Sequence, residues 1–198
     1  MSRKQNKGKG GRNKGKRQSG EDNTYGLQAV ILADSYTHKR FGPISQSIPK
    51  MLIPVAGCPM INYSIDLLIN SNVSEIFIIC SSHAAQLKEY IDSSQWTNPH
   101  WYPKLKIHIE CNEECDTVGD ALRYISNLNL IQSKTFVLCR GDCIANISLT
   151  EMIRKHEQRY KDSKDCLMTC LFKKAHHSQR ATYVSNPCFQ CTFQWTLQ

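Results

Sequence analysis

The sequence predicts an α/β fold in which a mostly parallel, Rossmann-like sheet carries helices on both faces. Short apolar runs, typical of strands buried on both faces, alternate with segments whose apolar residues recur at helical spacing. This alternation implies right-handed crossovers between parallel strands, which place helices on both sides of the sheet. The chain has 198 residues, 40% of them hydrophobic, so it is long enough to bury the core of one ordinary domain.

The first half of the chain predicts two strands and two helices in alternation. Residues 28–33 and 75–80 are continuous apolar runs and predict buried strands. Between them, Pro59 is expected to open a helix, because its fixed φ suits the first helical turn. One face of that helix carries the apolar residues Ile61, Ile65, Leu68 and Ile69, and a shorter helix follows with Ala84, Leu87 and Ile91.

The second half continues the same alternation. Residues 105–109 alternate in polarity and predict a strand, and the apolar runs at 135–139 and 166–172 predict two more. Two capping boxes predict helix starts, at Thr117 with Asp120 and at Ser148 with Glu151. Helical spacing follows each box, in Val118, Ala121, Leu122 and Ile125 and then in Ile153, His156 and Tyr160.

Positive charge is concentrated at the amino terminus. The first 17 residues contain eight of the 25 Lys and Arg residues and none of the 17 Asp and Glu residues, so the remaining chain is neutral. We expect a disordered basic arm over residues 1–24, either as an RNA contact or as a solubilising tail. A neutral folded part argues against a nucleic-acid-binding surface on the domain itself. Residues 10–16 match the spacing of a phosphate-binding loop, but no strand precedes them and Arg17 stands in place of Ser or Thr.

The predicted domain spans residues 25–180 and is expected to be incomplete. Residues 181–198 contain aromatic residues without a clear period, so an irregular end is expected there, as in a fragment of a longer protein. Neither an 18-residue apolar run nor a secretory signal is present, which predicts a cytosolic chain with no membrane contact and reduced cysteines. Structural zinc is considered mainly at the closely spaced pair Cys188 and Cys191.

Ligands of such sheets bind beyond the carboxyl ends of the strands, which directs attention to the loops at 33–54 and 140–146. The first loop contains a proline-rich pattern that extends to residue 59: Arg40, Pro43, Ser45, Pro49, Lys50, Pro54, Gly57 and Pro59. Prolines restrict their own φ and the conformation of the preceding residue. The loop is therefore expected to be rigid and to hold Arg40 and Lys50 where phosphates would lie.

This pattern resembles the sugar-phosphate nucleotidyltransferase family, as do the segment Val118-Gly-Asp-Ala-Leu122 and the pair Gly141-Asp142. The resemblance implies that Arg40 and Lys50 are relics of a phosphate-binding site and that Asp142 is the relic of a Mg²⁺ ligand. An active member would use Mg²⁺ with GTP or another nucleoside triphosphate. That enzymatic activity is one function that the sequence leaves open, as is RNA binding through the basic arm.

The turn after the first strand departs from the family. Where the family has glycines that wrap the triphosphate, this chain has Ala33-Asp34-Ser35 and no glycine up to Arg40. A carboxylate near the phosphates opposes nucleotide binding by roughly 1 to 4 kcal/mol. The sequence therefore predicts no cofactor and no catalytic residue, with Asp34 and Ser35 as further relic positions.

A closer resemblance accounts for this departure. The segments 27–36, 84–88 and 141–147 are similar to the epsilon-subunit family of eukaryotic translation initiation factor 2B, a guanine-nucleotide exchange factor. The resemblance implies an assembly and regulatory domain whose partners are the gamma and regulatory subunits and initiation factor 2. In that family the exchange domain lies far beyond the nucleotidyltransferase-like part, so this chain is expected to lack exchange activity of its own.

Overall fold

In the computed structural model, residues 26–34, 43–171 and 192–196 are described, and the side chains of 192–196 are not considered. The strands are β1 (Leu27–Leu32), β2 (Pro54–Val55), β3 (Cys58–Pro59), β4 (Val73–Cys80), β5 (Lys106–Cys111), β6 (Thr135–Arg140), β7 (Met168–Leu171) and β8 (Thr192–Thr196). The helices are α1 (Ile44–Ser47), α2 (Met60–Ile69), α3 (Ala84–Asp92), α4 (Val118–Asn127) and α5 (Thr150–Asp162), with short 3₁₀ helices at Lys50–Leu52 and Gln95–Thr97.

Six strands form the main sheet in the order β5-β4-β1-β6-β8-β7, and β2 pairs with β3 in a separate hairpin. The pairs β4–β5, β1–β4 and β1–β6 are parallel, whereas β8 runs antiparallel to both of its neighbours. The predicted α/β fold with a mostly parallel sheet is thus confirmed, as are the strand predictions in the chain up to β7. No helix among the described residues combines the length and apolar character needed to cross a membrane.

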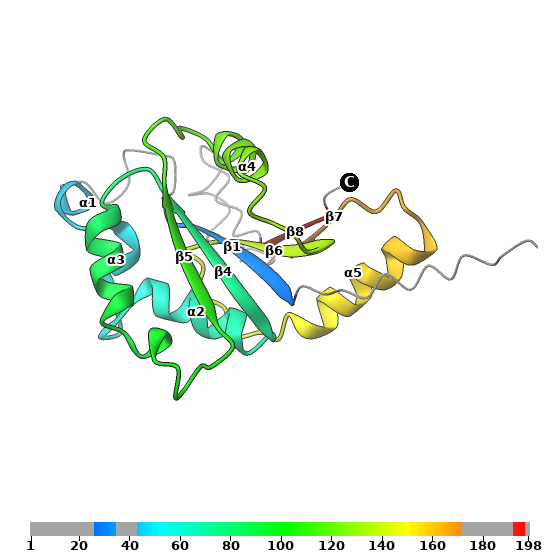
Figure 1. Ribbon diagram of the computed structural model, residues 1–198, viewed down its shortest axis with the longest axis horizontal. Coiled ribbons are helices and arrows are strands. Elements are labelled where there is room, and N and C mark those ends of the chain that lie inside the picture. The colour runs from blue at the N-terminus through cyan, green and yellow to red at the C-terminus, as the bar shows by residue number, and fades with distance from the viewer. Residues whose placement is uncertain (1–25, 35–42, 172–191, 197–198) are drawn as a thin grey trace, which may run out of the picture.

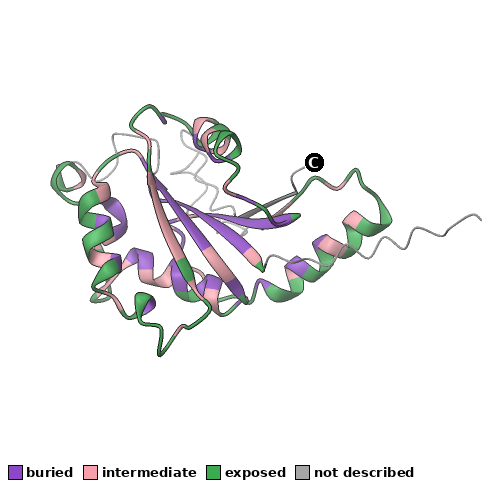
Figure 2. Cartoon of the chain, viewed as in Figure 1, coloured by how far each residue is buried: buried purple, intermediate pink, exposed green. Residues whose placement is uncertain are grey.

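Helices cover both faces of the sheet (Figure 1). On one face, α2, α3 and α5 pack against alternate residues of β1, β4 and β6, with Ile31, Ile65 and Ile78 fully buried. On the other face, α4 contributes Ala121 and Ile125 to a smaller cluster around the opposite side chains of the same strands. Figure 2 shows that the central strands are buried while the outer faces of the helices are exposed. This two-sided burial explains why the central strands are continuous apolar runs.

Local signals predicted most helix starts. Thr117 and Asp120 form the expected capping box, in which Thr117 Oγ1 accepts from the Asp120 N–H at 3.1 Å and Asp120 Oδ2 accepts from the Thr117 N–H at 3.0 Å. Pro59 directly precedes α2 as its cap residue instead of occupying the first helical position.

The capping box predicted at Ser148 and Glu151 is wrong. The helix α5 begins at Thr150 after Leu149, which has no side-chain cap. The N–H of the fully buried Leu149 instead donates to Ser71 Oγ at 3.3 Å. Glu151 binds Arg154 one turn along the same helix at 2.8 and 2.9 Å. The start of α5 is thus held by a tertiary contact with Ser71, in the turn after α2, and has no side-chain cap of its own.

The strand β8 lies at 192–196, within the segment expected to be irregular, and pairs between β6 and β7. The register joins Phe136 to Trp195 and Cys170 to Phe193. The basic arm at 1–24 and the cysteine pair considered for zinc lie outside the described residues.

Candidate functional site

Two of the residues singled out from the sequence lie at the carboxyl ends of central strands. Asp34 follows β1, and Asp142 follows β6. Lys50 begins a short 3₁₀ helix that the proline-rich loop places against Asp142. The structure thus brings Lys50 and Asp142 together, while Asp34 has a separate partner. Ser35 and Arg40 lie outside the described residues, so the structure does not test their predicted roles.

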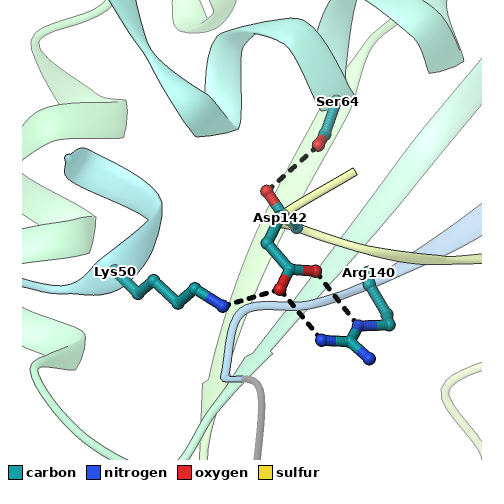
Figure 3. A network of polar contacts seen from close by, with 5 residues as sticks. Lys50, Ser64, Arg140 and Asp142 are labelled. Atoms are coloured by element: carbon teal, nitrogen blue, oxygen red, sulfur yellow. Dashed lines mark hydrogen bonds and ion pairs between the residues drawn. The ribbon is translucent and has the colours of Figure 1, made fainter. Parts of the chain in front are cut away.

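An ion-pair cluster of Lys50, Arg140 and Asp142 forms the centre of this region (Figure 3). Lys50 Nζ lies 2.6 Å from Asp142 Oδ2. Arg140 donates from both arms of its guanidinium, from Nε to Oδ1 at 3.0 Å and from one terminal nitrogen to Oδ2 at 2.9 Å. Both carboxylate oxygens of Asp142 are therefore engaged by cations of the chain itself.

Burial makes this cluster more than a surface ion pair. The side chains of Lys50, Asp142 and Arg140 are 8%, 19% and 24% exposed. Burial alone would raise the pKa of Asp142, but hydrogen bonds and charge from Arg140 and Lys50 outweigh it, and the pKa lies below its ordinary value. Asp142 is thus held ionised between two cationic side chains.

Backbone packing fixes the position of Asp142. A Cβ on the preceding Gly141 would lie 1.9 Å from Sδ and Cε of Met51, whose side chain is fully buried. Because Gly141 has no side chain, Met51 can pack on the end of β6. This packing places the adjacent Lys50 beside Asp142. From α2, Ser64 Oγ reaches the carbonyl oxygens of Gly141 and Cys143, each at 3.4 Å.

Asp34 lies at the neighbouring strand end and binds Ser81, the residue after β4. Oδ2 of Asp34 accepts from both the backbone N–H and the hydroxyl of Ser81, the latter at 2.9 Å. This contact ties the carboxyl ends of β1 and β4 together across the sheet. A carboxylate thus occupies the turn in which glycine N–H groups would be needed to wrap phosphates.

The described residues do not fit a Mg²⁺ ion at Asp142. Mg²⁺ takes oxygen ligands, commonly one or two carboxylates together with substrate phosphates. Here Lys50 and Arg140 engage the carboxylate, and no group of three or more His, Cys, Asp or Glu side chains in the described part of the chain is placed to hold a metal ion. We therefore derive no metal-dependent step at this site.

Two residues of this region were not singled out as site residues from the sequence. Arg140 stands two positions before Asp142 at a predicted strand end, and this proximity is the sequence signal that points to it. Ser81 offered no signal, because its contact depends on β1 and β4 being adjacent.

The eight cysteines in the described segments are free thiols, and burial is the main reason that the pKa of Cys80 is raised to about 12.

Residues 28–185 match the family model described as nucleotidyl transferase. Over 154 residues the chain is 38% identical to a protein of Dictyostelium discoideum named translation initiation factor eIF2B subunit epsilon, and over 159 residues it is 36% identical to the protein of that name in Schizosaccharomyces pombe. These alignments cover 78% and 79% of the chain but only 21% and 23% of the relatives, so the chain spans about a fifth of their length.

Solved structures give the same fold. A putative glucose-1-phosphate thymidylyltransferase from Bacillus anthracis, solved with sucrose, superposes with a TM-score of 0.63 at 15% identity. The match covers 86% of this chain and 71% of that one. At this identity the likeness concerns the fold alone.

Proposed function

The chain belongs to the nucleotidyl transferase family, and on that premise we propose that it acts in translation initiation as the nucleotidyltransferase-like domain of an initiation factor 2B epsilon subunit. In this role the domain assembles with other subunits and transfers no nucleotide. The observation that carries the proposal is the 36–38% identity to two epsilon subunits over more than three quarters of the chain.

The chemistry of the strand ends supports a non-catalytic role. Asp142 is neutralised by Lys50 and Arg140, so the carboxylate that the family resemblance assigns to Mg²⁺ is engaged within the protein. Asp34 binds Ser81 and leaves a carboxylate in the phosphate-binding turn. The two contacts tie loops to the sheet, which suits a rigid assembly domain better than a site that must open for a nucleotide and a sugar phosphate.

The proposed partners are the gamma and regulatory subunits of initiation factor 2B and initiation factor 2 itself, in the cytosol, with no cofactor. The resemblance to epsilon subunits supports these partners. The basic arm is proposed to contribute little to subunit assembly, since the folded part carries the similarity.

The test is affinity purification of the tagged chain from its own cells, followed by mass spectrometry. Recovery of the gamma and regulatory subunits is expected, both after nuclease treatment and from a chain that begins at residue 25. A chain that repeatedly brings down none of these subunits would refute the proposal. Recovery that disappears with nuclease or without the arm would instead favour an RNA contact.

A sugar-phosphate nucleotidyltransferase is the second candidate, because residues 28–185 match the nucleotidyl transferase family model. Its test is pyrophosphate release from GTP and a sugar phosphate in the presence of Mg²⁺. We expect no turnover above that of an Asp142→Ala variant. Turnover lost in that variant would overturn the assembly role as the sole function.

A further inference from the structure

The strand β5 forms one edge of the described sheet. It pairs with β4 on its inner side, and no other described strand pairs with its outer side (Figure 1). Its residues are half-buried in the middle and exposed at both ends. An edge of this kind presents a row of backbone N–H and C=O groups that can pair with another strand.

The hydrogen bonds of the adjoining residue show which backbone groups point outward. The N–H of Asn112, directly after β5, donates inward to the carbonyl of Cys80 at 3.0 Å. Backbone groups alternate in direction along a strand, so the N–H and C=O groups of Ile107, Ile109 and Cys111 point away from β4. Side chains alternate as well, and Lys106, His108 and Glu110 share one face of the sheet.

The sequence of β5 is complementary to itself when read in the opposite direction. Residues 106–110 are Lys-Ile-His-Ile-Glu, with opposite charges at the two ends and isoleucines on either side of the central histidine. We propose that β5 pairs in antiparallel fashion with β5 of a second copy of this chain, with the two His108 residues opposite each other on a two-fold axis. Such an isologous contact would extend the sheet across two molecules.

This register satisfies backbone and side chains together. Ile107 faces Ile109 of the second copy, and these outward-pointing residues exchange main-chain hydrogen bonds on both sides of the axis. Lys106 faces Glu110 of the second copy at a position without such hydrogen bonds, where opposing side chains approach more closely. Moving the register by one residue would place outward groups opposite inward ones and would lose these bonds.

A carboxylate of the same molecule lies beside the central histidine. His108 Nε2 lies 3.1 Å from Glu75 Oε1, and the imidazole stacks on Phe77 with ring centroids 5.0 Å apart. Each molecule therefore brings a carboxylate and an aromatic support to the axis. The side chain of His108 remains 43% exposed, which leaves it accessible to an opposing strand.

Charge reversal on β5 tests the pairing without disturbing the core. Sedimentation velocity over about a hundredfold range of concentration should show a monomer–dimer equilibrium for the wild-type chain. Lys106→Glu or Glu110→Lys alone places like charges opposite each other twice per dimer and should weaken association by about tenfold or more. The double variant restores both pairs, and a mixture of the two single variants should form a heterodimer. Asp162→Lys, at the end of α5, makes the same charge change as Glu110→Lys at a distant position and should leave association unchanged.

The inference would be overturned by a wild-type chain that stays monomeric over this range, or by single variants that associate like the wild type. Hydrogen exchange at the amides of Ile107, Ile109 and Cys111 adds a second readout. Their protection should increase with protein concentration. Protection independent of concentration would mean that a segment of the same molecule covers the edge, and would also overturn the proposal.

Discussion

Lys50 Nζ lies 2.6 Å from the carboxylate of Asp142, although 92 positions separate the two residues in the chain. The contact joins the proline-rich loop to the end of β6 and, with Arg140, leaves no oxygen of Asp142 without a cationic partner. In a partly buried setting, each charge of such a cluster depends on the others. The cluster is therefore a structural connection between two loops that the family resemblance associates with substrate binding.

Removing the carboxylate should destabilise the domain. Asp142→Asn removes the carboxylate charge that binds Lys50 and Arg140 and should lower the free energy of unfolding by about 2 to 3 kcal/mol, measured by urea denaturation. Glu151→Gln is the matched control, because Glu151 also binds an arginine but is well exposed. That control should change the urea midpoint little, and equal losses in the two variants would contradict the structural role of the cluster.

The contact between Gly141 and Met51 predicts a non-additive pair of substitutions. Gly141→Ala forces the buried Met51 aside and should lower the free energy of unfolding by about 2 kcal/mol. Because Met51→Ala makes room for the new methyl group, the double variant should lose less than the sum of the two single losses. Gly119→Ala serves as the control, since its Cβ would meet nothing closer than 3.6 Å in α4, and it should be slightly stabilising. Strict additivity in the double variant would exclude the proposed contact.

His156 should make the stability of the domain depend on pH. Its side chain is fully buried between α5 and β7, with Nδ1 2.9 Å from Thr169 Oγ1, and burial lowers its pKa below 6.5. The unfolded chain therefore takes up a proton first as the pH falls through about 6.5. Stability is fully present above that pH and should then fall by up to about 1.4 kcal/mol per pH unit, until the folded protein is protonated as well.

The measurement is urea unfolding of the wild type and of His156→Gln at pH 7.5 and pH 5.5. Glutamine keeps a polar group near Thr169 but does not titrate, so the variant should lose less stability between the two pH values than the wild type does. The same loss in both proteins would assign the pH dependence to other groups.

The β2–β3 hairpin predicts opposite effects for two neighbouring substitutions. Ala56 has a φ of 53° and Gly57 a φ of 80°, both in the left-handed region. Ala56→Gly should relieve strain and stabilise the domain by about 0.5 to 1 kcal/mol, whereas Gly57→Ala should destabilise it by about 1 kcal/mol. Open space surrounds the position of a Cβ on Gly57, so the second effect reports backbone conformation alone. Thermal unfolding of both variants provides the test, and shifts in the same direction would rule out this turn geometry.

Local sequence determined the main elements of this protein, because their signals lie within a few residues. The apolar run of β1 reflects burial on both faces of the sheet, and the Thr117–Asp120 box needs only one turn of helix to form. The order of strands and helices was enough to predict a mostly parallel sheet. It also directed attention to the strand ends where Asp34, Lys50 and Asp142 lie.

Only the tertiary structure decided which of these groups meet. Ser71 accepts a hydrogen bond from Leu149 at the start of α5, and Ser81 binds Asp34, because helix packing and strand order bring together residues that are distant in sequence. The same holds for Lys50 and Asp142, whose pairing requires Met51 to pack on a glycine at the end of β6. The sequence specified the charges through its residue types, but their neutralisation depends on distances that only the packed chain establishes.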